Sequence, residues 1–514
     1  MPLGCRLLVY LCRVLKQTNK RIFWGGLTGD LLSLGTVQAL GALLPLATVP
    51  HLLRVVGLES FGWYNLSLAL MNFGVAWVDY GFTLTGSRDK SAIDAHQASL
   101  DTHLTTTDTH QTTTDAHLTT TDAHLRTTDA HLTTTGAHQT TTDAHLRTTD
   151  AHLRTTDAHQ TGLRETGQKQ SNASQLLFSR YFFTQLLLLG IGLPVLVLLV
   201  MGIPSWRANA WFFFFSALLL PAQIFMPAWW LQGSRQFALL ARWQVLGRLL
   251  FALGVFVLID SPDDQLLLPL LNGGCMLLVS IAAFFQVTYT HKISLQWPGL
   301  ASCGALLRVN RPVFVGGLSS AFYAHSTLIV LELFAGVRWV GLISTLEKIM
   351  LVFRMAANSF QQVLIPRLSA IVSLAPLNAA TYLRKLVLPV ATLGFLGSIF
   401  LWVMGPQLLS LVAGQPQPEA EALLRWLALL PPILALGVLP SSLLLATKNN
   451  FLFGRNLTTA AAVAVGVHLL LVPYYGAWAT ITSLIAAELL LLWRNLASMK
   501  HVLVGKNNQV AHEG

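Results

Sequence analysis

The sequence has little charge for its length. Only 11% of its 514 residues are Asp, Glu, Lys or Arg, whereas 53% are hydrophobic. A soluble domain carries about 25% charged residues, and a soluble chain of this length would divide into several domains with wet surfaces. This deficit excludes a soluble multidomain protein. The net charge of +10 is therefore better explained by membrane topology than by binding to nucleic acid.

Cysteine is also scarce, and its spacing excludes two structural devices. The four cysteines show no Cys-x-x-Cys pair and no dense spacing, so neither a disulfide framework nor a zinc site is supported. The chain also lacks a Walker motif, a His-Glu-x-x-His helix and a nucleophile elbow. We therefore expect no bound cofactor or metal ion and no enzymatic reaction.

Apolar runs long enough to cross a bilayer recur along almost the whole chain. They predict an all-α membrane protein with about twelve transmembrane helices. Proline recurs within these runs, which favours a transporter with bent helices over a simple membrane anchor. The predicted spans are 28–50, 61–84, 181–203, 209–231, 243–260, 265–288, 312–335, 340–364, 386–405, 422–446, 453–473 and 476–493.

The positions of lysine and arginine indicate which side of the membrane each loop faces. If the N-terminus is inside, 26 of the 33 basic residues lie in inside segments and four lie in outside loops. The positive-inside rule then places both termini in the cytoplasm of a multi-pass inner-membrane protein. The longest outside loop runs only from about 406 to 421, so no extracytoplasmic domain is expected.

Two pairs of short motifs suggest an internal repeat. NKRIFWGGL at 19–27 resembles NRPVFVGGL at 310–318, and RVVGL at 54–58 resembles RWVGL at 338–342. The pairs occupy equivalent positions around the first and seventh predicted spans, which is typical of transporters with a substrate site between two halves. We expect a cytoplasmic amphipathic N-terminus (1–27), a first six-helix lobe (28–93 and 171–288), an insert (94–170), a cytoplasmic linker (289–311), a second six-helix lobe (312–496) and a cytoplasmic tail (497–514).

The insert contains ten near-copies of a seven-residue unit such as DAHLTTT and holds ten of the sixteen histidines. A coiled coil needs two apolar seams, which this Thr-rich unit does not supply. Histidines seven residues apart on a helix would lie about 10 Å from each other, too far to share one metal ion. We interpret the insert as a low-complexity, disordered cytoplasmic loop in the connection between the second and third spans.

Five segments share a family pattern. They are LLPLATVPHLLRVVGLESFGWYNLSLAL (43–70), DYGF (79–82) followed by Arg88, PAWWLQG (227–233), VGLISTLEKIM (340–350) and FQQVLIPRLS (360–369). These segments resemble Wzx-type oligosaccharide flippases, in the polysaccharide exporter branch of the multidrug/oligosaccharidyl-lipid/polysaccharide (MOP) superfamily. The resemblance covers most of the chain outside the insert. It implies two six-helix lobes around a central cavity that opens alternately to each side.

The resemblance further implies a function and partners. The protein would flip a polyprenyl-pyrophosphate-linked oligosaccharide to the outer leaflet for the synthesis of an O-antigen-like polysaccharide. Its partners would be this lipid-linked oligosaccharide, membrane lipid, and a polysaccharide polymerase and glycosyltransferases, without nucleic acid. Each sugar hydroxyl left unpaired in hydrocarbon costs roughly 2–7 kcal/mol. A polar cavity removes most of this barrier, and an anionic linkage favours positive charge in it.

Charged residues within or beside the predicted spans are the candidates for the substrate cavity. Residues seven apart share a helix face, as Glu347 and Arg354 do, and also Glu332 and His325. An alternative for the acidic residues is structural pairing of Glu332 with Lys348 or Arg354 inside the bundle. The full set of candidates is Arg54, Asp79, Glu332, Arg338, Glu347, Lys348 and Arg354.

Some of these residues have a structural alternative of their own. Asp79 is equally well explained as a lock that pairs with Arg88. Arg54 and Arg338 are the repeat-related arginines at the outer rim, where membrane anchoring is the alternative. Glu488 lies near the inner end of the last span and can reach water by extending its side chain.

The tryptophans near the ends of spans are interpreted mostly as residues of the membrane-interface belt. They include Trp206, Trp229 and Trp230, and stacking of the last two on sugar is the alternative.

Two other functions fit parts of the sequence. An ion-coupled multidrug or cation antiporter of the same superfamily would favour acidic cavity residues, whereas the seventh and eighth spans carry both signs. A polyprenyl-dependent glycosyltransferase or polymerase would need a sizeable loop with converging polar residues, which the short outside loops do not supply. A copy that has lost its function through the insert is a third alternative.

Overall fold

The computed structural model describes residues 47–95, 172–374, 376–413, 418–447 and 449–513. Within these ranges every regular element is a helix, as expected where the bilayer requires each backbone polar group to find an internal partner. The predicted all-α membrane fold is therefore confirmed. The N-terminal segment, most of the first predicted span and most of the insert lie outside the described residues.

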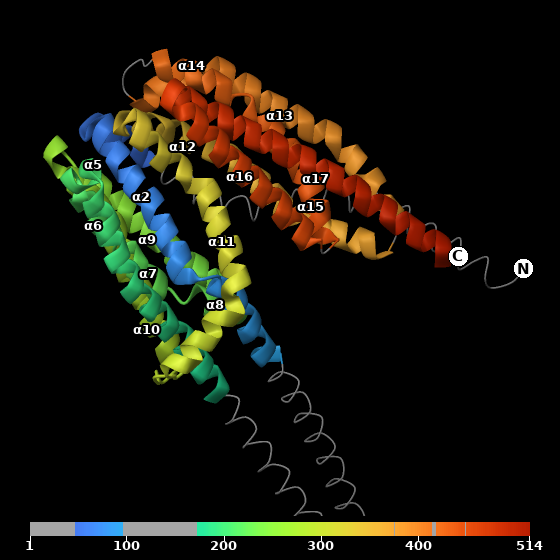
Figure 1. Ribbon diagram of the computed structural model, residues 1–514, viewed down its shortest axis with the longest axis horizontal. Helices are drawn as coiled ribbons and strands as arrows, with labels where there is room; N and C mark the ends of the chain where they lie inside the picture. Colours follow the sequence, from blue (N-terminus) through green and yellow to red (C-terminus); the bar gives the residue numbers. More distant parts are fainter. Residues whose placement is uncertain (1–46, 96–171, 375, 414–417, 448, 514) are drawn as a thin grey trace, which may run out of the picture.

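Helices follow one another along the chain with short connections (Figure 1). Segments 47–55 and 82–95 are also helical. The labelled helices and the long helix that precedes α5 are α2 (Gly57–Asp79), Asn172–Gly202, α5 (Pro204–Ala208), α6 (Ala210–Ser216), α7 (Leu219–Phe225), α8 (Ala228–Gly233), α9 (Phe237–Leu258), the 3-10 helix η1 (Pro262–Leu266), α10 (Leu267–Thr290), α11 (Leu300–Ala335), α12 (Val337–Leu374), α13 (Pro376–Ala413), α14 (Pro418–Leu427), α15 (Leu430–Ala446), α16 (Asn450–Tyr475) and α17 (Ala477–Glu513).

Among the described residues, eight helices are long and apolar enough to cross a membrane, or nine if the two parts of α11, bent by 47°, form one span. Two predicted spans, 61–84 and 340–364, correspond to α2 and α12, which are not among the eight. Both helices pack against other helices on more than one side. A helix enclosed in this way needs fewer apolar residues than one that faces lipid. The total of twelve spans stays a prediction.

The helices form two arms that meet at one end and diverge toward the other (Figure 1). The first arm contains α2, the helix Asn172–Gly202 and α5 to α10, and the second contains α13 to α17. Between them, α11 packs on α2 and α16, and α12 packs on α2 and α15. Following the predicted topology, we call the end at Gly336 the outer end and the end at Leu374, where α12 ends, the inner end.

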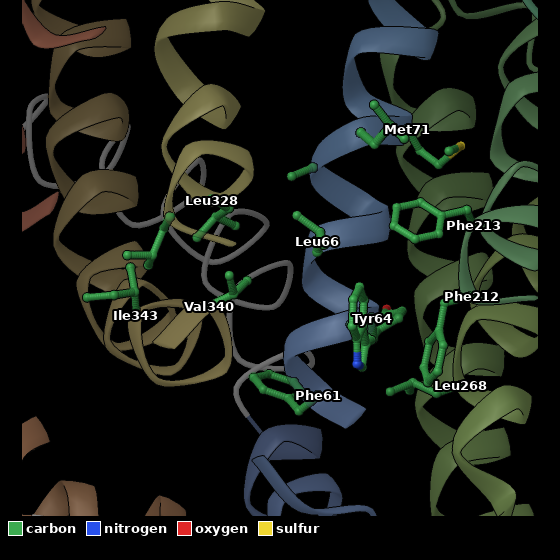
Figure 2. Close-up of a cluster of buried hydrophobic side chains, with 14 of the residues drawn as sticks. Phe61, Tyr64, Leu66, Met71, Phe212, Phe213, Leu268, Leu328, Val340 and Ile343 are labelled. Carbon is green, nitrogen blue, oxygen red and sulfur yellow. The ribbon is translucent and has the colours of Figure 1, made fainter. Parts of the chain in front are cut away.

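Apolar packing joins the arms mainly at the outer end. In Figure 2, Leu328, Val340 and Ile343 lie on one side of α2, and Phe212, Phe213 and Leu268 lie on the other. All belong to one buried core that continues from the first arm into α14 of the second. The inner part of the second arm has a separate core, built from α12, α13 and α15. The arms are therefore tied together where they meet and packed independently where they diverge.

The sequence also explains where helices break. Helix α2 ends at Asp79 because Tyr80 and Gly81 adopt left-handed φ angles of 48° and 78°. Gly336 has a φ of 89° and is the single residue between α11 and α12. Glycine reaches this region without steric cost and commonly ends helices. The predicted span 61–84 is therefore interrupted near its inner end, which gives Asp79 a special position.

Candidate functional site

Helices α2, α11 and α12 contact one another between the two arms. Phe73 of α2 packs edge-on against Phe322 of α11, with ring centroids 4.9 Å apart, and its centroid lies 6.3 Å from that of His325. Tyr80 stacks on Phe314 at 4.1 Å with an interplanar angle of 7°. Such ring pairs stabilise packing by about 0.5–1.5 kcal/mol beyond their burial. They hold α11 against α2 over much of its length.

At the outer end, α2 and α12 cross in close contact through two glycines. A Cβ atom placed on Gly62 would collide with the carbonyl oxygen of Val337, and one placed on Gly341 would collide with the carbonyl oxygen of Leu58. Small residues let helix backbones approach in this way. The crossing leaves no room for side chains between the two helices, so α2 and α12 are in backbone contact at the outer end.

Lys348 lies seven residues beyond Gly341 on α12 and therefore shares the helix face that crosses α2. It is half-buried and acts electrostatically on His325 of α11. His325 precedes Gly336 by eleven residues and Lys348 follows it by twelve, so the two lie at a similar depth on α11 and α12. Phe73 of α2 approaches His325 at this depth, on the inner side of the glycine crossing. Glu347 beside it interacts electrostatically with both Lys348 and Arg354.

Arg354 forms an ion pair across the second arm. Its Nη2 lies 3.7 Å from Oε1 of Glu488 on α17, and the two side chains are 36% and 12% exposed. Our expectation that Glu488 extends into water is therefore wrong. The alternative that Arg354 pairs with Glu332 is wrong as well. The ion pair connects α12 to α17 of the second arm, which assigns Arg354 a structural contact in addition to its candidate role.

The ion pair allows the first prediction. Arg354→Gln should lower the free energy of unfolding of the purified protein by about 1–3 kcal/mol, because the largely buried carboxylate of Glu488 loses its charged partner. The double variant Arg354→Gln/Glu488→Gln should recover most of that loss, since two amides can hydrogen-bond. Unfolding followed by size-exclusion fluorescence in detergent measures both. If the double variant is less stable than the single one, the pair does not explain the role of Arg354.

Glu332 lies at the outer end, away from the cations that we expected it to meet. It precedes Gly336 by four residues whereas Lys348 follows by twelve, so the two differ in depth by about 12 Å at 1.5 Å per residue. Its Oε2 instead accepts a hydrogen bond of 2.7 Å from Nε1 of Trp206 in α5. The predicted pairs with Lys348 and Arg354 are therefore wrong, and Trp206 is a buried partner rather than a belt residue.

The two repeat-related arginines are both exposed at the outer end. Nη2 of Arg54 donates a 2.9 Å hydrogen bond to the carbonyl oxygen of Leu411 in α13, which links the first half of the chain to the second arm. Arg338 lies in the first turn of α12. Neither arginine lies beside Lys348, so the structure separates the outer candidates from the inner ones.

Asp79 does not pair with Arg88, which instead lies 3.5 Å from Asp89 and is largely exposed. The Asp79 carboxylate accepts hydrogen bonds from the backbone N–H and the hydroxyl of Thr83, and a 3.3 Å bond from Nε2 of Gln223. It therefore caps the helix that follows the break at Tyr80, and the predicted lock with Arg88 is wrong. A short side chain that caps N–H groups is typical of such a position.

Trp229 and Trp230 are buried, with 4% and 2% of their surface exposed. Trp229 packs on Tyr181 at a centroid distance of 4.8 Å, and the Lys90 Nζ lies 4.3 Å from the centroid of the Trp230 ring. The segment PAWWLQG thus fixes the helix 82–95 to the first arm. Both the belt interpretation and stacking on sugar are wrong for these two residues.

Among the described residues, no cluster of three or more His, Cys, Asp or Glu side chains is arranged to hold a metal ion. All ten histidines of the insert lie outside those residues, so the geometry does not bear on them.

Comparisons with known proteins found a matching family model and two curated relatives. Residues 161–372 match the family model for "Polysaccharide biosynthesis protein". A "Putative O-antigen transporter" of Escherichia coli (strain K12) is 19% identical over 84% of this chain and 86% of its own. One of Shigella dysenteriae is 23% identical over 56% of this chain and 72% of its own.

Two solved structures share the fold. One is the inward-facing conformation of a multidrug resistance MATE family transporter of the MOP superfamily, with a TM-score of 0.60, 12% identity, and coverage of 91% of this chain and 99% of its own. The other is MATE in complex with MaL6, with a TM-score of 0.52, 12% identity, and coverage of 93% and 97%. Together these findings support the resemblance to Wzx-type flippases, and the solved structures show that the fold is shared with MATE transporters.

The family resemblance drawn from the sequence is therefore confirmed. The curated relatives are named transporters, and the two solved structures are those of transporters. These likenesses favour transport over the glycosyltransferase and polymerase alternatives.

Sequence reasoning missed several contacts in the candidate site. Phe73 and Phe322 lie in ordinary apolar runs, and nothing in their spacing marks them as packing partners. Trp206 follows a proline in a short outside loop, and a tryptophan beside an arginine there suggested only interfacial anchoring. A search for donors able to satisfy the buried Glu332 would have pointed to it, because buried carboxylates need hydrogen-bond partners.

Proposed function

We propose that this protein is a flippase that carries a polyprenyl-pyrophosphate-linked oligosaccharide from the cytoplasmic to the outer leaflet by alternating access. The observation that supports this most is the position of Lys348. A cation lies at the convergence of α2, α11 and α12, with the outer end closed beyond it and the arms diverging on its inner side. Keeping a charge at this depth costs at least about 2.5–3.5 kcal/mol in lipid, so a solvated path between the arms is its natural environment.

The chemistry of the substrate fits this arrangement. The pyrophosphate is anionic and attracts a cation, and the sugar hydroxyls need polar partners throughout their passage. Aromatic rings such as Phe73 and Phe322 line the same region and offer flat apolar faces to sugar rings. The lipid tail stays in the bilayer and projects between helices. Among the candidates, we assign Lys348 to the head group, with Glu347 and Arg354 setting the local charge balance.

The direction of transport follows from the charge distribution. The arms diverge at the end that carries most of the basic residues, and basic loops remain in the cytoplasm. We therefore propose that this conformation is open to the cytoplasm and that both termini and the insert lie there, at an inner membrane. A polysaccharide polymerase would receive the flipped product, and glycosyltransferases would supply the substrate.

A second candidate is ion-coupled antiport of drugs or organic cations, favoured by the fold likeness to MATE transporters. The two functions differ in the charge of their cargo. A cation such as Lys348 at the convergence attracts an anionic head group and repels a cationic drug. This observation favours the oligosaccharide.

The experiment uses proteoliposomes that contain the purified protein and a fluorescent polyprenyl-pyrophosphate-linked oligosaccharide. We expect the fraction of head groups reached by an impermeant glycosidase to rise well above that in protein-free vesicles. A parallel assay follows efflux of a cationic dye under an imposed proton or sodium gradient. Dye efflux without oligosaccharide movement by the folded protein would replace our proposal with antiport.

A further inference from the structure

Two polar contacts join the first half of the chain to the second at the outer end, in addition to the glycine crossing. One is the hydrogen bond from Trp206 in α5 to Glu332 in α11, at 2.7 Å. The other is the bond from Arg54 to the carbonyl oxygen of Leu411, at 2.9 Å. Both contacts lie where the arms meet, so both must change if the arms separate there.

The contact of Trp206 with Glu332 is the more deeply buried of the two. Trp206 is 1% exposed and Glu332 is 7% exposed, whereas Arg54 lies at the surface. In the described part of the chain, the indole N–H is the one hydrogen-bond donor to the Glu332 carboxylate. A buried carboxylate that loses its donor loses its main stabilisation. The same carboxylate recovers stabilisation once water reaches it.

We propose that Trp206 and Glu332 form the latch of an outer gate, whose moving surfaces are the crossing of α2 and α12 at Gly62 and Gly341. The proposal rests on alternating access in the proposed function. Glu332 is then a positioning residue that holds the outer end shut, and it does not contact the substrate. When the arms separate there, water replaces the indole as donor, so the bond can break and re-form reversibly during a cycle.

Val337 supplies a reporter for this gate. Its side chain reaches the Gly62 position across the crossing, and only 9% of its surface is exposed. We would place a single cysteine there (Val337→Cys) in a chain whose four native cysteines are replaced by serine. The purified protein in lipid nanodiscs is treated with a bulky charged maleimide, and the labelling rate measures how often the gate opens. The measurement needs no substrate, and it does not depend on how the protein is oriented in the membrane.

In this background, Trp206→Phe removes the donor but keeps the ring that stacks on Phe213 at 5.2 Å. We expect about tenfold faster labelling, because one unsatisfied buried acceptor shifts an equilibrium by about that factor. Glu332→Gln keeps an acceptor oxygen and should label at close to the parent rate. Trp243→Phe is the matched control, since it removes an indole bond of 2.8 Å to Gln286 within the first arm. It should leave the rate unchanged.

Arg54→Ala provides a second variant at an exposed position, where misfolding is not expected, and should also accelerate labelling. A parent-like rate in folded Trp206→Phe would overturn the latch, as would equal acceleration by Trp243→Phe, and acceleration by Arg54→Ala alone would assign the closure to the Arg54 contact instead. The test separates the latch from the proposed function. A flippase without the latch still moves the oligosaccharide in proteoliposomes, and a gated transporter of another cargo still shows the labelling pattern.

Discussion

Replacing Lys348 by glutamine should reduce oligosaccharide export at least about tenfold while the protein level holds. The loss corresponds to a charge-assisted hydrogen bond to the pyrophosphate, worth roughly 1.5–3 kcal/mol, and each 1.4 kcal/mol is a factor of about ten. Lys348→Arg keeps the charge and should retain part of the activity. Surface polysaccharide in cells and the proteoliposome assay measure the effect.

The control for this prediction is Lys385→Gln, which removes an exposed lysine near the inner end of α13. It should change export little, because an exposed charge is screened by water and salt. The double variant Glu347→Gln/Lys348→Gln separates two roles for Lys348. If it restores full export, the lysine only balances the charge of Glu347, and its assignment to the substrate is wrong.

Gly341→Leu should abolish export. Its side chain would have to occupy the space where Gly341 meets the carbonyl oxygen of Leu58, which is backbone and cannot move aside cheaply. Forcing extra methylenes into close packing costs typically about 1–3 kcal/mol, and more against backbone. The arms could then no longer close at the outer end. The flipping rate and the labelling rate at Val337→Cys should respond in opposite directions.

Gly274→Leu is the matched control, because no atom lies within 4 Å of a Cβ placed there on α10. It should preserve export and the size-exclusion profile. If Gly341→Leu prevents accumulation of the protein, Gly341→Ala gives a graded version of the same collision. Normal export by a well-folded Gly341→Leu protein would show that close contact of α2 and α12 is not part of the cycle.

Much of this architecture could be predicted from the sequence because apolar runs, basic loops and helix-breaking glycines are local signals. The charges of α12 could be identified for the same reason, since a lysine within an apolar run is conspicuous. The partners of these charges could not be identified from the sequence. Arg354 meets Glu488 on α17, and Trp206 meets Glu332 across 126 residues of chain. Such contacts depend on how helices rotate and cross, which hydrophobic periodicity does not specify.

The break of α2 could be predicted only in part from the sequence. Gly81 marks a possible interruption, but the span prediction ran through it because the flanking residues are apolar. For that reason, the carboxylate of Asp79 is predicted from the sequence to pair with the basic side chain of Arg88. Its actual partners are the backbone and hydroxyl of Thr83, four residues away, which any aspartate before a new helix can reach. Local geometry determined its role more than charge did.

Because the inner part of the second arm has its own core, that arm can rotate as one rigid unit. Helix α13 has 38 residues, which corresponds to roughly 57 Å at 1.5 Å per residue. If the arm pivots about the shared core at the outer end, a rotation of about 10° sweeps its far tip through roughly 10 Å over that length. A displacement small enough to break one indole hydrogen bond at the pivot can therefore move the far end of α13 by roughly 10 Å relative to the first arm.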